Sequence, residues 1–466
     1  MSSGSKLRRK WKRLVVRAAL RRRRIRRYVR RKLTWNRLYR TTSYLKSALW
    51  TVPLIAIVLV FLTAPLLRLL DAWLGWRITS IAESGLEAMY QTVITLTLSF
   101  LVFTFGSLLV AIQVASGQLT PRIIATTLLR NNVVRYSVGL FVFTLVFAVV
   151  ALNRSGGATS VPQLVAVVTA VLGVASIADF LFLIDYAARL LRPVSVVASV
   201  GNDGAQVIKS VYPASSGGLV AEAAPLRAQL GAPARMLPHS GTSGIVLAVD
   251  LATVLSLARR SAGVVEFWPQ VGDFVAVDEP LFALYGGAAA IDDRALRTTV
   301  AFGGERTLEQ DPMFALRILV DIALKALSPA INDPTTAVLA IDQVHRLMRV
   351  LGKRQLRGEI ICDETGEPRV IFRTPNWENY VNLACHEIRM CGASNVQIAR
   401  RMRAMLDNLD RSLPEHRRPA LAAELELLDR AIDASYANPE DRALARIPDS
   451  QGLGGAPALD RTAAGA

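Results

Sequence analysis

Four long apolar segments constrain this chain more than any other feature of its sequence. They cover residues 48–67, 89–114, 136–152 and 161–184. Each is near or above the ~20 residues that an α-helix needs to cross the hydrocarbon of a bilayer. The 52% hydrophobic residues and the mean hydropathy of +0.33 agree with a membrane protein. The sequence therefore predicts a four-helix transmembrane domain over residues 47–186.

The basic residues of the chain are concentrated at its N-terminus. The net charge is +18, and residues 1–46 carry +19 of positive charge with no acidic residue. By the positive-inside rule, a basic tail before the first span and an even number of spans place both termini in the cytoplasm. We therefore expect a multipass protein of the cytoplasmic (inner) membrane. Its tail should bind anionic lipid headgroups in the bilayer rather than nucleic acid, because arginine-rich tails beside a span set topology and attract lipid.

The second span carries small and polar residues on one face. Four of them recur every seven residues and two lie beside these, namely Thr92, Ser99, Gly106 and Gln113 with Thr95 and Ser116. One interpretation is a close-packed seam between helices, since small residues allow backbones to approach in lipid. The other is the wall of a hydrated path. The seam is the simpler interpretation, and both stay open.

Span four contains an ionisable residue. Asp179 lies inside the apolar segment, whereas Asp185 lies at its cytoplasmic end. An acid within a span is costly and is a functional candidate by default. The alternative is a protonated or arginine-paired carboxyl that locks the helices together.

The rest of the chain predicts an α+β cytosolic domain. Within it, a small β-rich module resembles a barrel-sandwich, with strands at residues 244–249 and 264–267 and a closing hairpin around the turn at residues 277–280. The lysine that carriers of this kind modify is absent from the turn, so we expect no cofactor. The predicted segments are a helix and irregular connector (187–242), the β module (243–290), a mainly helical part with a hairpin at 358–375 (291–446), and a disordered tail (447–466).

Residues 307–351 predict two amphipathic helices joined by a polar corner. Each helix begins with an Asp-Pro pair, in which the aspartate caps and the proline lacks an amide that would go unpaired. The candidate polar residues are Asp311, Arg317, Asp321, Ser328, Asn332 and Asp333. Caps and turn chemistry account for Asp311, Ser328 and Asp333. A ligand site that uses the whole group is the alternative.

A short cytoplasmic link between spans two and three holds Gln118, Pro121 and Arg122. We expect Arg122 to bind lipid headgroups or to dock onto the cytosolic domain, with Asp333 or a neighbouring acid as its partner.

The common catalytic and metal motifs do not occur. The sequence has no GxxxxGK[ST], HExxH or GxSxG. Cys385, His386 and Cys391 have the wrong spacing for a zinc site, and free thiols on a helix are the simpler interpretation. We therefore predict no catalytic residue, metal or cofactor, and we do not favour an enzyme.

Two motifs resemble a known family. ASGQLTPRIIATTLLRNN (residues 115–132) and ALSPAINDPTTA (residues 326–337) are similar to signatures of a bacterial family of multipass membrane proteins, domain of unknown function twenty-two fifty-four. The resemblance covers residues 41–436 and implies four spans and a cytosolic C-terminal domain, but no established activity. Many members have histidines near the end of span four, where this chain has Asp185 and Tyr186. A metal or proton role tied to those histidines is therefore not expected.

These features lead to two functional hypotheses from different classes. In the first, a homo-oligomer places its span-two stripes around a shared axis, and the cytosolic domain gates a path for ions or a small solute. In the second, the spans only assemble a membrane-anchored sensor or scaffold, and the soluble helices bind a protein or ligand. A membrane enzyme is the weakest alternative.

Overall fold

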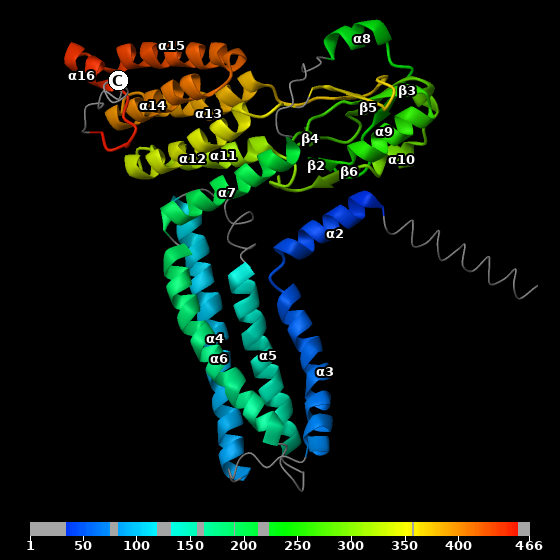
Figure 1. Cartoon of the computed structure of the whole chain (residues 1–466), viewed down its shortest axis with the longest axis vertical. Helices are drawn as coiled ribbons and strands as arrows, with labels where there is room; N and C mark the ends of the chain where they lie inside the picture. Colours follow the sequence, from blue (N-terminus) through cyan, green and yellow to red (C-terminus); the bar gives the residue numbers. More distant parts are fainter. Residues whose placement is uncertain are drawn as a thin grey trace, which may run out of the picture. The chain divides into compact units, whose positions relative to one another are not determined.

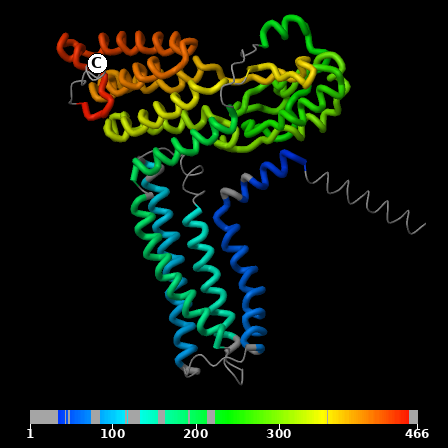
Figure 2. Tube along the Cα trace, viewed as in Figure 1, coloured from blue at the N-terminus to red at the C-terminus, as the bar shows by residue number. Residues whose placement is uncertain are grey.

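The computed structural model describes residues 34–74, 83–118, 132–155, 163–190, 192–212, 223–356 and 358–454. The chain forms two compact units, each built from separate segments (Figure 1). The first, which we call the β unit, comprises Met1–Tyr44, Gly217–Asp311 and Arg357–Thr374. The second, which we call the helical unit, comprises Leu45–Ser216, Pro312–Leu356 and Pro375–Ala466. Figure 2 traces the same path through both units.

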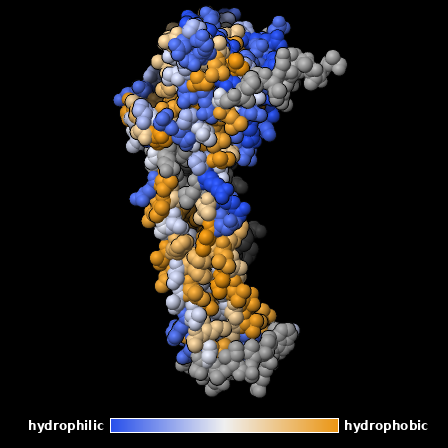
Figure 3. All heavy atoms as spheres, turned by 90° about the vertical axis from the view of Figure 1, so that its left-hand side faces the viewer, coloured by the Kyte–Doolittle hydropathy of each residue, from blue (hydrophilic) through white to orange (hydrophobic). Residues whose placement is uncertain are grey.

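Four long apolar helices begin the helical unit. They are α3 (Thr51–Leu74), α4 (Glu83–Gln118), α5 (Asn132–Ser155) and α6 (Gln163–Leu190). All four are long and apolar enough to cross a membrane, which confirms the prediction of four such helices. Hydrophobic residues cover much of their outer surface (Figure 3). An apolar outer surface of this kind suits a lipid environment rather than water.

Small residues bring the long helices close together. A Cβ added at Gly139 of α5 would lie 2.6 Å from Val52 Cγ1 of α3. A Cβ at Gly173 of α6 would lie 2.9 Å from Val93 Cγ2 of α4. Asp71, near the end of α3, accepts a hydrogen bond from the Leu164 amide at 3.0 Å and so caps the first turn of α6. Steric fit and this cap hold the four helices as a bundle.

The remaining helices of the helical unit pack on α11 and α12 or, in the case of α15 and α16, on α13 and α14. Their bounds are α7 (Pro193–Val211), α11 (Pro312–Ala326), α12 (Pro334–Gly352), α13 (Trp377–Gly392), α14 (Val396–Ser412), α15 (Arg418–Ser435) and α16 (Pro439–Ala445), with a 3₁₀ turn, η3, at Glu415–Arg417. Ile318 and Ile322 of α11 and Ile341 and Val344 of α12 are fully buried. The predicted helix pair is therefore present, and its apolar faces form the core.

The β unit contains two sheets. The larger has the strand order β1-β5-β3-β8-β7 and is antiparallel except for the β3–β8 pair, in which Val265 faces Val370. The smaller has the order β4-β2-β6. The strands are β1 (Arg235–Pro238), β2 (Gly244–Val249), β3 (Gly263–Phe267), β4 (Phe274–Val275), β5 (Pro280–Gly286), β6 (Val300–Gly303), β7 (Ile360–Cys362) and β8 (Pro368–Phe372). Buried side chains of both sheets, including Phe267 and Phe282, share one apolar core.

Short helices cover the sheets of the β unit. They are α2 (Trp35–Ser47), α8 (Ala224–Leu230), α9 (Leu251–Arg260), α10 (Asp293–Arg297) and the 3₁₀ turn η2 (Gly287–Ala290). Asp250 caps α9 by accepting a hydrogen bond from the Thr253 amide at 3.1 Å. Trp35 and Tyr39 of α2 stack on each other and pack against Leu247 and Ala248 of β2.

Three expectations about the chain after span four need correction. The closing hairpin around residues 277–280 is wrong, because β4 pairs with β2 whereas β5 pairs with β1 and β3. Asp278, with φ +69°, turns the chain there from one sheet to the other. The connector within residues 187–242 contains α8 and β1. The hairpin formed by β7 and β8 is present within residues 358–375.

The third correction concerns residues 447–454, which we expected to be part of a disordered tail. Arg400 of α14 is fully buried and donates hydrogen bonds to the carbonyls of Ile447 (2.9 Å) and Gly454 (2.6 Å). Asp449 accepts from the amides of Gly452 and Gly454. A buried guanidinium needs such acceptors, and this need orders the segment. Residues 455–466 lie outside the described part of the chain.

We expect Gly204→Val to destabilise the helical unit. A Cβ at Gly204 of α7 would lie 2.8 Å from the Ala315 Cβ and 2.9 Å from Leu347 Cδ1. Overpacking at such a contact costs about 1–3 kcal/mol. Gln206→Val, on the exposed side of the same helix, introduces the same side chain without a clash. Thermal unfolding in detergent should show a lower Tm for Gly204→Val than for Gln206→Val, and equal Tm values would contradict the packing.

Candidate functional site

Asp179 lies on α6 inside the bundle of long helices. Its Oδ1 accepts a hydrogen bond from Ser137 Oγ of α5 at 3.2 Å. Its Oδ2 is buried and has no hydrogen-bond partner among the residues that the structure describes. A buried carboxylate oxygen without a donor is costly in a low-dielectric environment. In the described part of the chain Asp179 therefore lacks the arginine partner that one interpretation required.

Further polar side chains share this interior with Asp179. Ser176 Oγ of α6 donates to Thr144 Oγ1 of α5 at 3.1 Å, three residues from Asp179 along α6. We call the whole set the buried hydroxyl row; it consists of Thr97 and Thr104 on α4, Ser137 and Thr144 on α5, and Thr169 and Ser176 on α6. Each helix contributes two members seven residues apart, and every member is at most 3% exposed. The heptad spacing of these hydroxyls is a signal for the row that can be recognised in the sequence.

The predicted span-two stripe lies on the other side of α4. Its described members Thr92, Thr95, Ser99, Gly106 and Gln113 are all exposed. Apart from the neighbouring backbone of α4 itself, no atom of the described residues lies within 4 Å of a Cβ built at Gly106. The stripe thus faces away from the other three long helices. The Ser116 side chain lies outside the described residues.

Two hydroxyls of the stripe are satisfied within their own helix. Thr92 Oγ1 donates to the Ala88 carbonyl at 2.7 Å, and Ser99 Oγ donates to the Thr95 carbonyl at 2.8 Å. Hydroxyls bonded to the preceding turn do not need water or a second helix. The stripe is therefore a small, only weakly polar surface.

The polar corner between α11 and α12 is held by its own turn. The Asn332 amide donates to the Ser328 carbonyl at 2.8 Å, and the Asp333 amide donates to the Ala326 carbonyl at 2.7 Å. Asn332 has φ +47°, a left-handed conformation that asparagine tolerates better than most residues. Ser328 Oγ donates to the Lys325 carbonyl, and Asp333 caps α12 through the Thr336 amide at 3.1 Å. Turn and cap roles thus engage all three corner residues.

The other three candidates have different partners. Arg317 donates to Asp321 Oδ1 at 2.7 Å and to both carboxylate oxygens of Glu387, a residue of α13 that the sequence analysis missed. Asp311, in the β unit, is 4% exposed and accepts two hydrogen bonds from Arg306. The hydrogen bonds named here thus place the six residues in three sets of contacts. Each set has a structural role.

The remaining candidates are the cytoplasmic link between spans two and three and Asp185 at the end of α6. Pro121, Arg122 and the Gln118 side chain lie outside the described residues, so the docking of Arg122 stays a prediction. Asp185 forms an exposed ion pair with Arg189, one turn later on α6.

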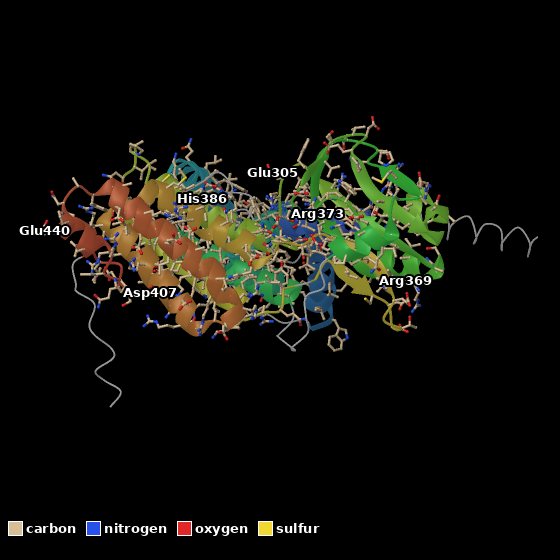
Figure 4. All side chains as sticks on the ribbon, turned by 90° about the horizontal axis from the view of Figure 1, so that it is seen from above. Glu305, Arg369, Arg373, His386, Asp407 and Glu440 are labelled. Atoms are coloured by element: carbon tan, nitrogen blue, oxygen red, sulfur yellow. The ribbon has the colours of Figure 1, made fainter. Side chains whose placement is uncertain are left out.

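The cysteine and histidine group on α13 is divided between the core and the surface. Cys385 is buried, where desolvation raises the pKa of its thiol, whereas Cys391 is exposed. His386 is exposed on α13 (Figure 4). Arg389 Nη2 lies 3.1 Å from the His386 Nδ1 atom. Among the described residues, no three His, Cys, Asp or Glu side chains are placed to hold a metal ion.

A bundle of four apolar helices with an interior acid, followed by a mixed helical and sheet part, defines a membrane-protein class. Residues 46–408 match the family described as "Predicted membrane protein (DUF2254)", and the chain belongs to this family. Uncharacterized proteins of Mycobacterium bovis (Mb1321c) and Mycobacterium tuberculosis strain H37Rv (Rv1290c) are each 27% identical over 430 residues. Each alignment covers 88% of this chain and 81% of the relative. No solved structure matches the chain significantly.

We expect Arg317→Met to destabilise the helical unit by about 1–3 kcal/mol, because two partly buried carboxylates lose their cation. The Arg317 side chain is only 23% exposed. As a control, Arg430→Met breaks an ion pair with Glu426 whose side chains are 65% and 72% exposed. Such a pair contributes about 0–1 kcal/mol. Chemical denaturation should separate the two variants, and similar losses would contradict the assigned role of Arg317.

Proposed function

We propose that this protein is a homo-oligomer of the cytoplasmic membrane in which α4 of each copy lines a shared axis. The cytosolic domain then gates a path for ions or a small solute along that axis. One observation carries the proposal: a heptad stripe of small and polar residues is exposed on a helix whose other exposed side chains are largely apolar. A second copy of the chain is the partner that would cover it.

The spacing of the stripe supports a symmetric arrangement. Residues that recur every seven positions stay on one face of helices that supercoil around each other. Thr92 and Gln113 are 21 positions apart, which corresponds to about 32 Å of helix. The hydrocarbon core of a bilayer is about 30 Å thick. The stripe is therefore long enough to line an axis through the whole hydrocarbon layer.

Gly106 favours contact with another helix. A glycine inside a helix costs about 1 kcal/mol relative to alanine. Glycines are common at helix–helix interfaces in membranes because they let a second backbone approach closely. Gly106 has no such neighbour within the described chain. In the proposed oligomer, α4 of another copy fills this space.

The link between α6 and α7 provides a route for gating. Only residues 191 and 192 separate the end of α6 from Pro193, the first residue of α7. Gly204 of α7 contacts α11 and α12 closely. A shift of the α11–α12 pair would therefore move the end of α6. We propose that this coupling connects the cytosolic helices to the path.

A specific observation favours the second hypothesis, a membrane-anchored sensor or scaffold without transport. The hydroxyls of Thr92 and Ser99 are satisfied inside α4, so a dry interface between copies could bury them without water. Such an oligomer would assemble through the stripe and conduct nothing. The two functions thus share one interface and differ only in its hydration.

Disulfide crosslinking tests the shared interface. In a variant without the three native cysteines, Ser99→Cys should form a covalent dimer under oxidation because it faces the axis. Phe105→Cys is a matched control, since Phe105 is exposed on α4 away from the stripe. We expect the crosslinked fraction of Ser99→Cys to exceed that of the control at least about fivefold. Equal crosslinking, or none at either position, would exclude α4 as the interface.

Flux measurements separate the conduit from the scaffold. The triple variant Thr92→Leu, Ser99→Leu and Gln113→Leu should lower ion or solute flux in liposomes at least about tenfold, because an apolar axis repels water. Leu98→Val with Phe105→Leu changes exposed apolar positions of α4 and should leave flux unchanged. Oligomer size is measured in parallel. If wild-type liposomes show no flux under voltage, tension or pH change while the crosslink forms, the scaffold is the correct function.

A further inference from the structure

An open groove of about 580 Å³ lies on the helical unit. It shares no lining residue with the span-two stripe of α4 or with the polar corner. One face of α12 forms most of the groove, because the lining residues that α12 contributes recur at helical spacing. The main lining side chains are Lys209 of α7 and Asp342, His345, Arg346, Arg349 and Lys353 of α12 or its C-terminal cap.

The groove has a strong excess of positive charge. Together with Arg354, its lining contains five cations and one carboxylate. That carboxylate, Asp342, already accepts a hydrogen bond from Arg401 Nε of α14 at 2.7 Å. Within the described part of the chain, none of the five cations forms an ion pair. A concave surface lined by one sign of charge concentrates the electrostatic field and attracts counter-ions.

Neutral partners orient the arginines and leave their charge in place. Arg346 Nη1 donates to the Asn202 side-chain carbonyl at 2.8 Å. Arg349 Nη1 donates to the Asn408 side-chain carbonyl at 3.2 Å. Arg354 donates to a backbone carbonyl of α7's C-terminal cap at 3.2 Å. These contacts place the guanidinium groups without neutralising them.

His345 is part of this support. Arg401 Nη2 lies 3.1 Å from His345 Nδ1, which must therefore accept, so the proton is on Nε2 and is donated to Asn408 at 3.0 Å. Burial, with Arg401 and Arg349 nearby, lowers the pKa of His345 despite the hydrogen bond to Asn408 and the charge of Asp342. The neutral imidazole thus fixes the Asn408 amide, and the amide in turn holds Arg349.

Structural needs do not account for this arrangement. Elsewhere in the helical unit, partly buried arginines pair with acids, as Arg317 does with Glu387 and Arg389 with Glu424. A helix C-terminus favours cations in its last turn, but Arg346 lies beyond that range. Neighbouring like charges on one helix face destabilise the helix. A bound anion would relieve this repulsion.

We propose that the groove binds an anion that carries two or more phosphate groups. Arg346 and Lys353 are seven residues apart on one face, which is about 10 Å along the helix, so a single phosphate does not reach both. Arginine donors match phosphate oxygens in pairs. The described lining residues include no Phe, Tyr or Trp on which a nucleobase could stack. The ligand is therefore recognised through its phosphates, whether it is a soluble polyphosphorylated compound or a diphosphate lipid headgroup.

The test uses the full chain in phosphatidylcholine nanodiscs with inorganic tripolyphosphate as the probe. The groove variant is Arg346→Gln, Arg349→Gln and Lys353→Gln. The control variant is Arg411→Gln, Arg418→Gln and Arg430→Gln, which removes the same charge from exposed positions of α14 and α15. Hydrogen–deuterium exchange of peptides covering residues 342–354 reports on the groove, because the basic N-terminal tail is identical in all three proteins and lies elsewhere in the sequence.

We expect tripolyphosphate to protect residues 342–354 in the wild type and in the control variant. In the groove variant, the probe concentration for half-protection should rise by more than about 100-fold, since each cation makes a charge-assisted contact. The single variants Arg346→Gln and Lys353→Gln should each raise the half-protection concentration about tenfold. Because they change exposed side chains, they test the groove even if the triple variant has a folding defect. Absence of protection both by tripolyphosphate and by a diphosphate lipid headgroup, or equal protection in groove and control variants, overturns the proposal.

A second arm distinguishes the two sources of phosphate. Nanodiscs that contain cardiolipin present a diphosphate headgroup without soluble ligand. Protection of residues 342–354 in these discs alone assigns the groove to the lipid, whereas protection by tripolyphosphate alone assigns it to a soluble compound. Neither result depends on conduction, because the groove shares no residue with the α4 stripe.

Discussion

The packing of α7 against α11 and α12 is the contact on which the helical unit depends. α7 follows the last long apolar helix directly, and its glycines at positions 201 and 204 allow α11 and α12 to approach closely. Full burial of an aliphatic side chain contributes about 1.5–3 kcal/mol. Ile318, Ile322 and Ile341 are all fully buried in this core. Helix α7 thus packs directly on the core helices α11 and α12, and in the sequence it follows the last long apolar helix after two residues.

The pairing of charged side chains is a second constraint on the helical unit. Arginines that point into the packed helices find acids or carbonyls, and Arg400 orders the chain after α16 for this reason. The exposed face of α12 departs from the rule, because its cations contact amides instead of carboxylates. A concave surface lined by one sign of charge focuses the electrostatic field and concentrates counter-ions. The same helix thus has one face that holds the core and one that is available to a ligand.

Sequence periodicity predicted the helices in which buried residues recur at regular intervals. Residues that are close together in the chain determine the four apolar helices, the α11–α12 pair and the Asp333 cap. The sequence alone therefore predicted them. Contacts between residues that are far apart in the chain could not be predicted from the sequence. Glu387 contacts Arg317 across 70 positions, and Val265 of β3 pairs with Val370 of β8 across 105 positions. The turn between β4 and β5 looks like a hairpin in the sequence, but the two strands belong to different sheets. Their pairing depends on distant strands, and a local turn pattern does not contain that information.

The two faces of α4 explain why the span-two pattern is easily misjudged. Thr97 and Thr104 are buried against α5 and α6, whereas Thr92 and Ser99 are exposed, although all four belong to heptad patterns on one helix. A hydroxyl that bonds the preceding turn costs little in either environment, so threonine and serine alone do not reveal which face is buried. Asp179 is different, since a carboxylate oxygen cannot bond within its own helix in this way. Its contact with Ser137 identifies the α5–α6 side as the polar interior. On the opposite face of α4, no other part of the described chain comes within 4 Å of a Cβ built at Gly106, so this face has room for the close approach that glycine permits between helices.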